Sequence, residues 1–138
     1  MDLEKFKKFI NTNDRFAASN GMSVIEVRPG IAKASLTVCE NHLNGVNIIQ
    51  GGALFTLADL AFAAASNAHG LVAVGLTATI SFFKPGLTGD ILTAEAKEVN
   101  LTARTACYNV DITNNSGVLI AQFNGIAYRK KESIDEKF

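Results

Sequence analysis

The sequence predicts an α+β fold in which a curved antiparallel sheet wraps around one long central helix, with a short N-terminal helix in addition. One long segment has a helix-favouring composition and is apolar on almost every side. The chain after this segment consists of strand-like stretches joined by short turns, which indicate antiparallel neighbours. An apolar helix needs cover on most sides, and a curved sheet provides that cover.

The central helix is expected from Gly51 to about Asn67, where Ala and Leu dominate and no helix breaker follows the two opening glycines. Gly70 suits a C-terminal cap. Asp59 is the exception within this apolar segment, because burying an unpaired charge is costly. Asp59 therefore needs either a partner or a chemical role.

The other elements follow from apolar periodicity and from turn residues. An amphipathic helix is expected at residues 2–12, and a hairpin is expected from strands at 23–28 and 31–40. Later strands are expected at 71–84, 90–99, 103–113 and 118–129, as antiparallel neighbours, and residues 131–138 are expected to form a frayed tail. Residues 1–138 are expected to form a single domain.

Composition excludes several classes of function. Lys and Arg number 13, as do Asp and Glu, and this balance argues against nucleic acid or an anionic membrane as the main partner. No segment resembles a signal peptide and no apolar run is long enough to span a bilayer, so a cytoplasmic protein is expected. Cys39 and Cys107 are expected to be buried free thiols, with no metal role.

The glycine pair at the helix start predicts a site for an oxyanion or a polarised carbonyl. The first N–H groups of a helix lack partners, and Gly51 and Gly52 let a ligand approach them. Gly51 and Asp59 are about 12 Å apart along the axis and roughly 80° apart around it, so one small group cannot touch both. Two copies with antiparallel helices would bring them together, which indicates a site shared across a two-fold dimer.

Two motifs then carry a family resemblance. The run from Asn44-Gly45 through Gln50-Gly51-Gly52 to Asp59 resembles the signature of hotdog-fold acyl-CoA thioesterases of the PaaI-like branch. Residues 79–86, with Gly89-Asp90, are similar to the strand and turn that follow in that branch. The resemblance covers about residues 21–129. It implies a hotdog fold, a dimer or a homotetramer built as a dimer of dimers, and hydrolysis of coenzyme A thioesters by a carboxylate without a metal or other cofactor.

The resemblance also implies roles for single residues. Asp59 matches the catalytic carboxylate, and Gly51 matches the glycine whose N–H polarises the thioester carbonyl. Asn44 matches a loop residue that places the substrate. A serine or threonine on the next strand often holds the attacking water, and Thr77 and Thr79 both remain candidates for that position. In this family the carboxylate and the glycine come from opposite subunits.

The chain departs from the family pattern at one position. The family usually has His before the glycine pair, whereas this chain has Gln50. A glutamine can form hydrogen bonds but cannot relay a proton or become cationic. We therefore expect hydrolysis to be retained and the substrate range to be affected, with Gln50 and Gly52 among the substrate-binding residues.

Structural roles remain alternatives for these positions. Asp59 could be a satisfied helix carboxylate, the glycines could only permit a tight helix entry, and Asn44 could be only a turn residue. His42 and His69 belong to no ligand-spaced or catalytic set and are expected to be mainly structural. Four cations could meet the phosphates of coenzyme A but are more often surface charges: Lys84, Arg104, Arg129 and Lys130.

The sequence is compatible with three functions. The leading hypothesis is an acyl-CoA thioesterase with Asp59 as general base or nucleophile. The second is a non-catalytic acyl-CoA sensor or binding module on the same fold. A dehydratase of hydroxyacyl thioesters is third, because that chemistry is usually associated with a histidine and the motif here contains none. The sequence leaves open the acyl group, coenzyme A versus acyl carrier protein, and dimer versus tetramer.

Overall fold

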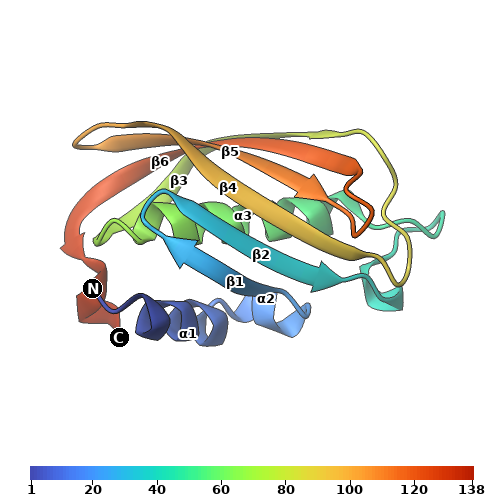
Figure 1. Cartoon of the computed structure of the whole chain (residues 1–138), viewed down its shortest axis with the longest axis horizontal. Coiled ribbons are helices and arrows are strands. Elements are labelled where there is room, and N and C mark those ends of the chain that lie inside the picture. The colour runs from blue at the N-terminus through green and yellow to red at the C-terminus, as the bar shows by residue number, and fades with distance from the viewer.

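The computed structural model describes residues 1–138 and confirms the α+β architecture. Helix α3 (Gly51–Asn67) lies against one face of a curved six-stranded antiparallel sheet with the order β1-β2-β4-β5-β6-β3 (Figure 1). The strands are β1 (Ser23–Arg28), β2 (Ile31–Thr37), β3 (Leu71–Phe82), β4 (Ile91–Leu101), β5 (Thr105–Thr113) and β6 (Leu119–Ser133). None of the helices combines the length and the apolarity that crossing a membrane would need.

The N-terminal helix is followed by a second, shorter one. Helix α1 (Leu3–Asn13) packs on β1, and helix α2 (Arg15–Ser19) follows at once. Asp14 ends α1 and also caps α2, because its Oδ1 accepts the N–H of Ala17 at 3.2 Å. The sequence pattern missed α2, because five residues are too few to show a helical period.

Small residues let α3 lie close to the sheet. Phe62 packs edge-on against Tyr108 at 5.6 Å between ring centroids. Its ring also covers Gly125, where an added Cβ would lie 3.0 Å from Phe62, so a larger residue there would push the Phe62 ring away from the strand. Fully buried alanines line both sides of the interface: Ala58, Ala61, Ala64 and Ala65 on α3, and Ala32, Ala34, Ala94 and Ala96 on the sheet. The helix is therefore fixed rigidly on the sheet.

The strand order corrects the expectation that consecutive strands after the helix are neighbours. β3 pairs with β6 rather than with β4, while β4 lies between β2 and β5. Residues 83–90 carry the chain from the β3 edge to the middle of the sheet. A short connection therefore does not make β3 and β4 neighbours, because these eight residues span the end of the sheet instead of forming a hairpin turn.

The C-terminal tail differs from the expected frayed segment. Residues 131–133 continue β6, and a 3-10 turn (Ile134–Lys137) follows with Ile134 buried. The ring of Phe138 stacks on Phe9 at 5.2 Å, which places the C-terminus beside α1. Apolar contact outweighs the charged composition that suggested fraying.

The two cysteines are unpaired, as expected, but they are not both buried. Cys39 is exposed and Cys107 is half-buried. Cys107 belongs to β5 on the side of the sheet that faces away from α3, next to the inward-facing Tyr108. Strand alternation therefore explains why an apolar stretch leaves this thiol partly accessible.

A polar cluster closes the far end of α3. Tyr108 is fully buried, and its hydroxyl donates to Glu98 Oε2 at 2.9 Å. The same carboxylate oxygen contacts Nε2 of His69, just beyond the end of α3. Burial raises the pKa of the Tyr108 phenol, and the hydrogen bond to Glu98 and the charge of that carboxylate raise it further. The neutral phenol therefore persists as a donor and ties β5 to β4.

We expect Tyr108→Phe to lower the free energy of unfolding by about 1 kcal/mol, because Glu98 loses a donor that water cannot easily replace. Urea denaturation measures the change. Tyr128→Phe is the matched control, since Tyr128 is exposed on β6 and should change stability by less than about 0.5 kcal/mol. A Tyr108→Phe protein as stable as the parent would contradict the role assigned to this hydrogen bond.

Candidate functional site

The start of α3 offers one free backbone donor. Gln50 is the N-cap, and its Oε1 accepts the N–H of Gly52 at 2.6 Å. The N–H of Ala53 donates to the Gln50 carbonyl oxygen at 2.9 Å. The N–H of Gly51 makes no hydrogen bond within the chain. Gly51 is therefore the donor left for a ligand, whereas the donor of Gly52 is already occupied.

The segment before the helix is held by a buried histidine. Nδ1 of His42 accepts the N–H of Cys39 at 3.0 Å, so the proton lies on Nε2, which donates to the Asn20 carbonyl at 2.7 Å. The carbonyl of His42 accepts the N–H of Gln50 at 2.8 Å. His42 thus has the structural role expected from the sequence, and it fixes the approach to the helix.

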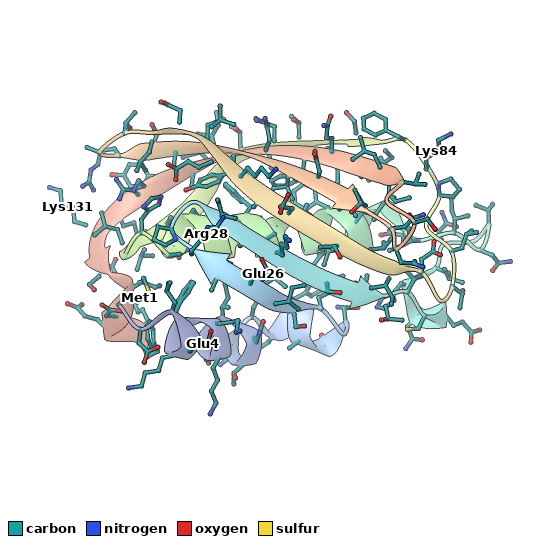
Figure 2. All side chains as sticks on the ribbon, viewed as in Figure 1. Met1, Glu4, Glu26, Arg28, Lys84 and Lys131 are labelled. Carbon is teal, nitrogen blue, oxygen red and sulfur yellow. The ribbon has the colours of Figure 1, made fainter.

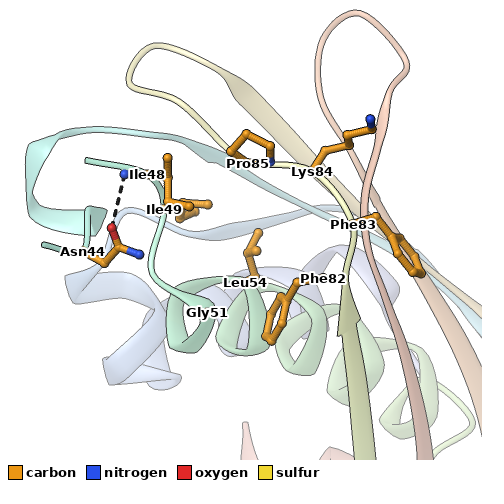
Figure 3. Close-up of a pocket in the computed structure, with 9 residues that line it drawn as sticks. All are labelled: Asn44, Ile48, Ile49, Gly51, Leu54, Phe82, Phe83, Lys84 and Pro85. Carbon is orange, nitrogen blue, oxygen red and sulfur yellow. Dashed lines mark hydrogen bonds between the residues drawn. The ribbon is translucent and has the colours of Figure 1, made fainter. Parts of the chain in front are cut away.

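Asn44 contributes both to the turn and to a cavity. Its Oδ1 accepts the N–H of Val46 at 3.0 Å. It also accepts the N–H of Ile48 at 3.3 Å (Figure 3). Its Nδ2 makes no hydrogen bond within the chain, and the side chain lines the cavity beside Gly51. The turn role and the substrate-facing role are therefore compatible, because they use different atoms of the amide.

The cavity at the helix start has a volume of about 590 Å³. Phe82, the last residue of β3, approaches Gly51 so closely that an added Cβ there would lie 3.0 Å from Cζ of the ring. The lining of the cavity is mostly apolar (Figure 3) and consists of Asn44, Ile48, Ile49, Gly51, Leu54, Phe82, Phe83, Lys84 and Pro85. An apolar group can fill this space while a carbonyl at its end reaches the Gly51 N–H.

Asp59 lies on the one face of α3 that the sheet leaves open. It is exposed in the single chain, together with Gly52 and Phe55 on the same side of the helix. The expectation of a helix enclosed all round is therefore wrong for one chain. Partial burial among neighbouring residues raises the pKa of the Asp59 carboxyl above its usual range, and the negative charge of Asp14 raises it further. Asp59 is thus a carboxylate without a fixed partner, about 12 Å from Gly51 along the helix.

The edge strand β3 is also open. It pairs with β6 on one side and has no neighbour on the other. The strand is 12 residues long and carries large exposed apolar side chains, including Val74, Leu76 and Phe82. A long, apolar, unprotected edge is typical of a strand that pairs with another chain.

The two threonine candidates are not brought to the cavity within one chain. Thr79 pairs with Asn124, whereas the next residue pairs with Phe123, whose ring packs on Phe55 of α3 at 5.3 Å. Thr79 therefore faces away from the helix. Thr77 is exposed at a bulge of β3. Alternation along the strand sequence could not predict which face of the sheet the two threonines occupy, because the bulge interrupts the register.

The candidate cations divide into two groups. Lys84 lies at the rim of the cavity, with its ammonium group pointing away from the cavity (Figures 2 and 3). Nη1 of Arg104 donates to the Arg129 carbonyl at 2.8 Å, and Nη1 of Arg129 donates to the Thr102 carbonyl at 2.8 Å. These two arginines join the connection between β4 and β5 to β6, while Lys130 is exposed. No group of three His, Cys, Asp or Glu side chains is arranged to hold a metal ion.

Sequence reasoning missed the apolar wall of the cavity. Phe82 and Phe83 are each about half exposed, and both line the cavity with Leu54. Nothing in the local sequence marks Phe82 as a neighbour of Gly51, because the contact joins the end of β3 to the start of α3. The cap formed by Gln50 was also missed, since glutamine is not a preferred N-cap residue.

Known proteins share this fold and this region of the chain. Residues 46–121, which include Gly51 and Asp59, match the thioesterase superfamily. The chain is 40% identical over 117 residues to the acyl-coenzyme A thioesterase PaaI of Escherichia coli K12, covering 85% of this chain and 84% of that protein.

Solved structures give the same result. The structure of the E. coli PaaI protein from the phenylacetic acid degradation operon has a TM-score of 0.91 at 36% identity and covers 95% of each chain. A hypothetical thioesterase of Streptococcus pneumoniae with coenzyme A has a TM-score of 0.80 at 26% identity and covers 87% of this chain and 96% of that one. These matches confirm the hotdog fold and the resemblance to the PaaI-like branch, and they show that the chain belongs to the thioesterase superfamily.

Proposed function

We propose that the protein is an acyl-CoA thioesterase, which hydrolyses a thioester of coenzyme A to the free acid and coenzyme A. The observation that carries the proposal is the unpaired N–H of Gly51, a residue that lines a mostly apolar cavity at the start of the helix. Such a donor polarises a carbonyl and stabilises the oxyanion that forms during attack. The likeness to a protein named acyl-coenzyme A thioesterase and to a structure with coenzyme A supports the choice of thioester.

In the proposed reaction the carbonyl oxygen of the thioester accepts a hydrogen bond from the Gly51 N–H, and the acyl group occupies the apolar cavity. As general base, Asp59 takes a proton from water while the water oxygen attacks the thioester carbon. The tetrahedral intermediate then collapses, the carbon–sulfur bond breaks, and the leaving sulfur receives the proton. As nucleophile, Asp59 would instead attack the carbon and form an anhydride that water then hydrolyses. Both routes need an ionised Asp59 close to the carbonyl.

A second copy of the chain completes the proposed site. One chain holds Gly51 and Asp59 too far apart for a single thioester group. Two copies joined along β3, with antiparallel α3 helices, would bring Gly51 of one chain to the partner's Asp59. The exposed edge of β3 and the open face of α3 support this arrangement, because both are left uncovered in one chain. By the family resemblance, two such dimers form a homotetramer.

The remaining candidates receive supporting roles in this proposal. Nδ2 of Asn44 is the second donor that can reach the substrate beside Gly51. Thr77 or Thr79 would hold the attacking water only if the partner chain brings one of them to its Asp59. The unpaired cysteines agree with a cytoplasmic location, where thiols stay reduced.

We expect Asp59→Asn to lower kcat at least ~100-fold, because the amide keeps the shape of the side chain but cannot accept a proton. A thiol-release assay on a panel of acyl-CoAs measures the loss, and circular dichroism checks that the variant is folded. Turnover at the parent rate would exclude Asp59 as base or nucleophile. A parent protein that binds acyl-CoA but releases no thiol would indicate the non-catalytic binding module instead.

We expect kcat/KM to fall as the pH drops through the raised pKa of Asp59, because the protonated carboxyl is neither base nor nucleophile. Asp14→Asn keeps a capping side chain on α2 but removes one cause of the raised pKa of Asp59. The acidic limb of the pH profile of kcat/KM should therefore move to lower pH. Glu26→Gln, on the exposed surface of β1, is the matched control and should leave the limb in place. A limb that does not move in Asp14→Asn would contradict this electrostatic coupling.

A further inference from the structure

We propose that Gln50 is a positioning residue of the thioesterase site, a role that rests on the function proposed above. Its side chain occupies the N–H of Gly52, so that among the backbone donors of the helix start only the N–H of Gly51 is presented to the thioester carbonyl. Gln50 thus acts through the helix start and not by contact with the substrate. This differs from the substrate-binding role expected for Gln50 and Gly52 from the sequence.

The contact between Gln50 and Gly52 is close. Oε1 of Gln50 lies 2.6 Å from the Gly52 nitrogen. A Cβ added to Gly52 would lie 2.5 Å from the same oxygen, which is closer than real Cβ atoms come to such an atom. A larger residue at position 52 would therefore displace the Gln50 side chain from the start of the helix.

The backbone around Gln50 holds that side chain in place. Its N–H donates to the carbonyl of the buried His42 at 2.8 Å, and both ring nitrogens of His42 are bonded to the chain. Its own carbonyl accepts the N–H groups of Ala53 at 2.9 Å and Leu54 at 3.3 Å. Of the first three donors of α3, two are therefore occupied and only that of Gly51 is free.

A single free donor at the helix start fixes where the thioester carbonyl binds. If the donors of Gly51 and Gly52 were both free, the carbonyl could bind at either, and only one position would suit the attacking group. Displacement of a reacting carbon by about 1 Å can cost on the order of 100-fold in rate. Occupying the Gly52 donor removes the second position.

The cap is also neutral. A carboxamide adds no charge beside the partial positive charge of the helix start, which therefore stays available to the developing oxyanion. A carboxylate in the same place would cap the helix equally well, because anions are favoured at helix starts. It would, however, oppose the negative charge that forms on the thioester oxygen. Stability and turnover should therefore respond in opposite ways to such a change.

Three substitutions of Gln50 test the proposal in the full-length protein, with kcat and KM from thiol release and Tm from thermal unfolding. Gln50→Ala removes the cap, so kcat should fall about 10- to 100-fold with little change in KM. Gln50→Ser should recover most of that loss, because a serine N-cap bonds the donors of the first turn but is too short to reach a bound substrate. Gln50→Glu should keep or raise the parent Tm and lower kcat at neutral pH.

The outcomes separate this proposal from the proposed function. A parent protein that releases no thiol from any acyl-CoA would remove the function itself. If the parent is active and Gln50→Ser is as slow as Gln50→Ala, Gln50 contacts the substrate directly and the positioning role is overturned. A Gln50→Glu protein with the parent kcat would overturn it equally, because the charge at the helix start would then not act on the oxyanion.

Discussion

The spacing of Gly51 and Asp59 along α3 is the constraint on which the rest of the structure depends. A helix fixes the two residues about 12 Å apart, and neither can move toward the other without breaking backbone hydrogen bonds. The helix is further fixed on the sheet by facing alanines and by Phe62 over Gly125. The carbonyl-binding donor and the carboxylate therefore belong to two different places in one chain. Chemistry that needs both groups at one carbon requires two copies.

The uncovered parts of the chain are consistent with this requirement. The sheet wraps α3 on most sides but leaves exposed the row that contains Gly52, Phe55 and Asp59. The neighbouring edge of β3 exposes large apolar side chains and unpaired backbone groups. Exposed apolar surface and open strand edges are costly features for an isolated chain. Both are explained if a second copy covers them.

The local composition and apolar periodicity of the sequence predicted the central helix and most of the strands. They did not predict contacts between segments that are distant in the sequence. The bounds of α3 are those expected from composition, since Gly51 opens the helix and Asn67 ends it. The pairing of β3 with β6 was not predicted, because a short connection was taken to join neighbours. The orientation of Thr79 depends on a bulge in β3, which sequence alternation does not reveal. The cap formed by Gln50 on Gly52 depends on a side-chain conformation and was equally hidden.

The most direct test of the shared site is complementation between two inactive variants. Gly51→Pro removes the donor N–H but keeps the helix, because proline is favoured at the first position of a helix. Asp59→Asn removes the carboxylate. Each homodimer should be inactive. Refolding equal amounts together should restore about a quarter of the parent activity, because half of the randomly assorted dimers are mixed and each mixed dimer has one intact site. If the mixture, shown to contain mixed dimers, stays inactive, Gly51 and Asp59 act within one chain or not at all, and the account is contradicted.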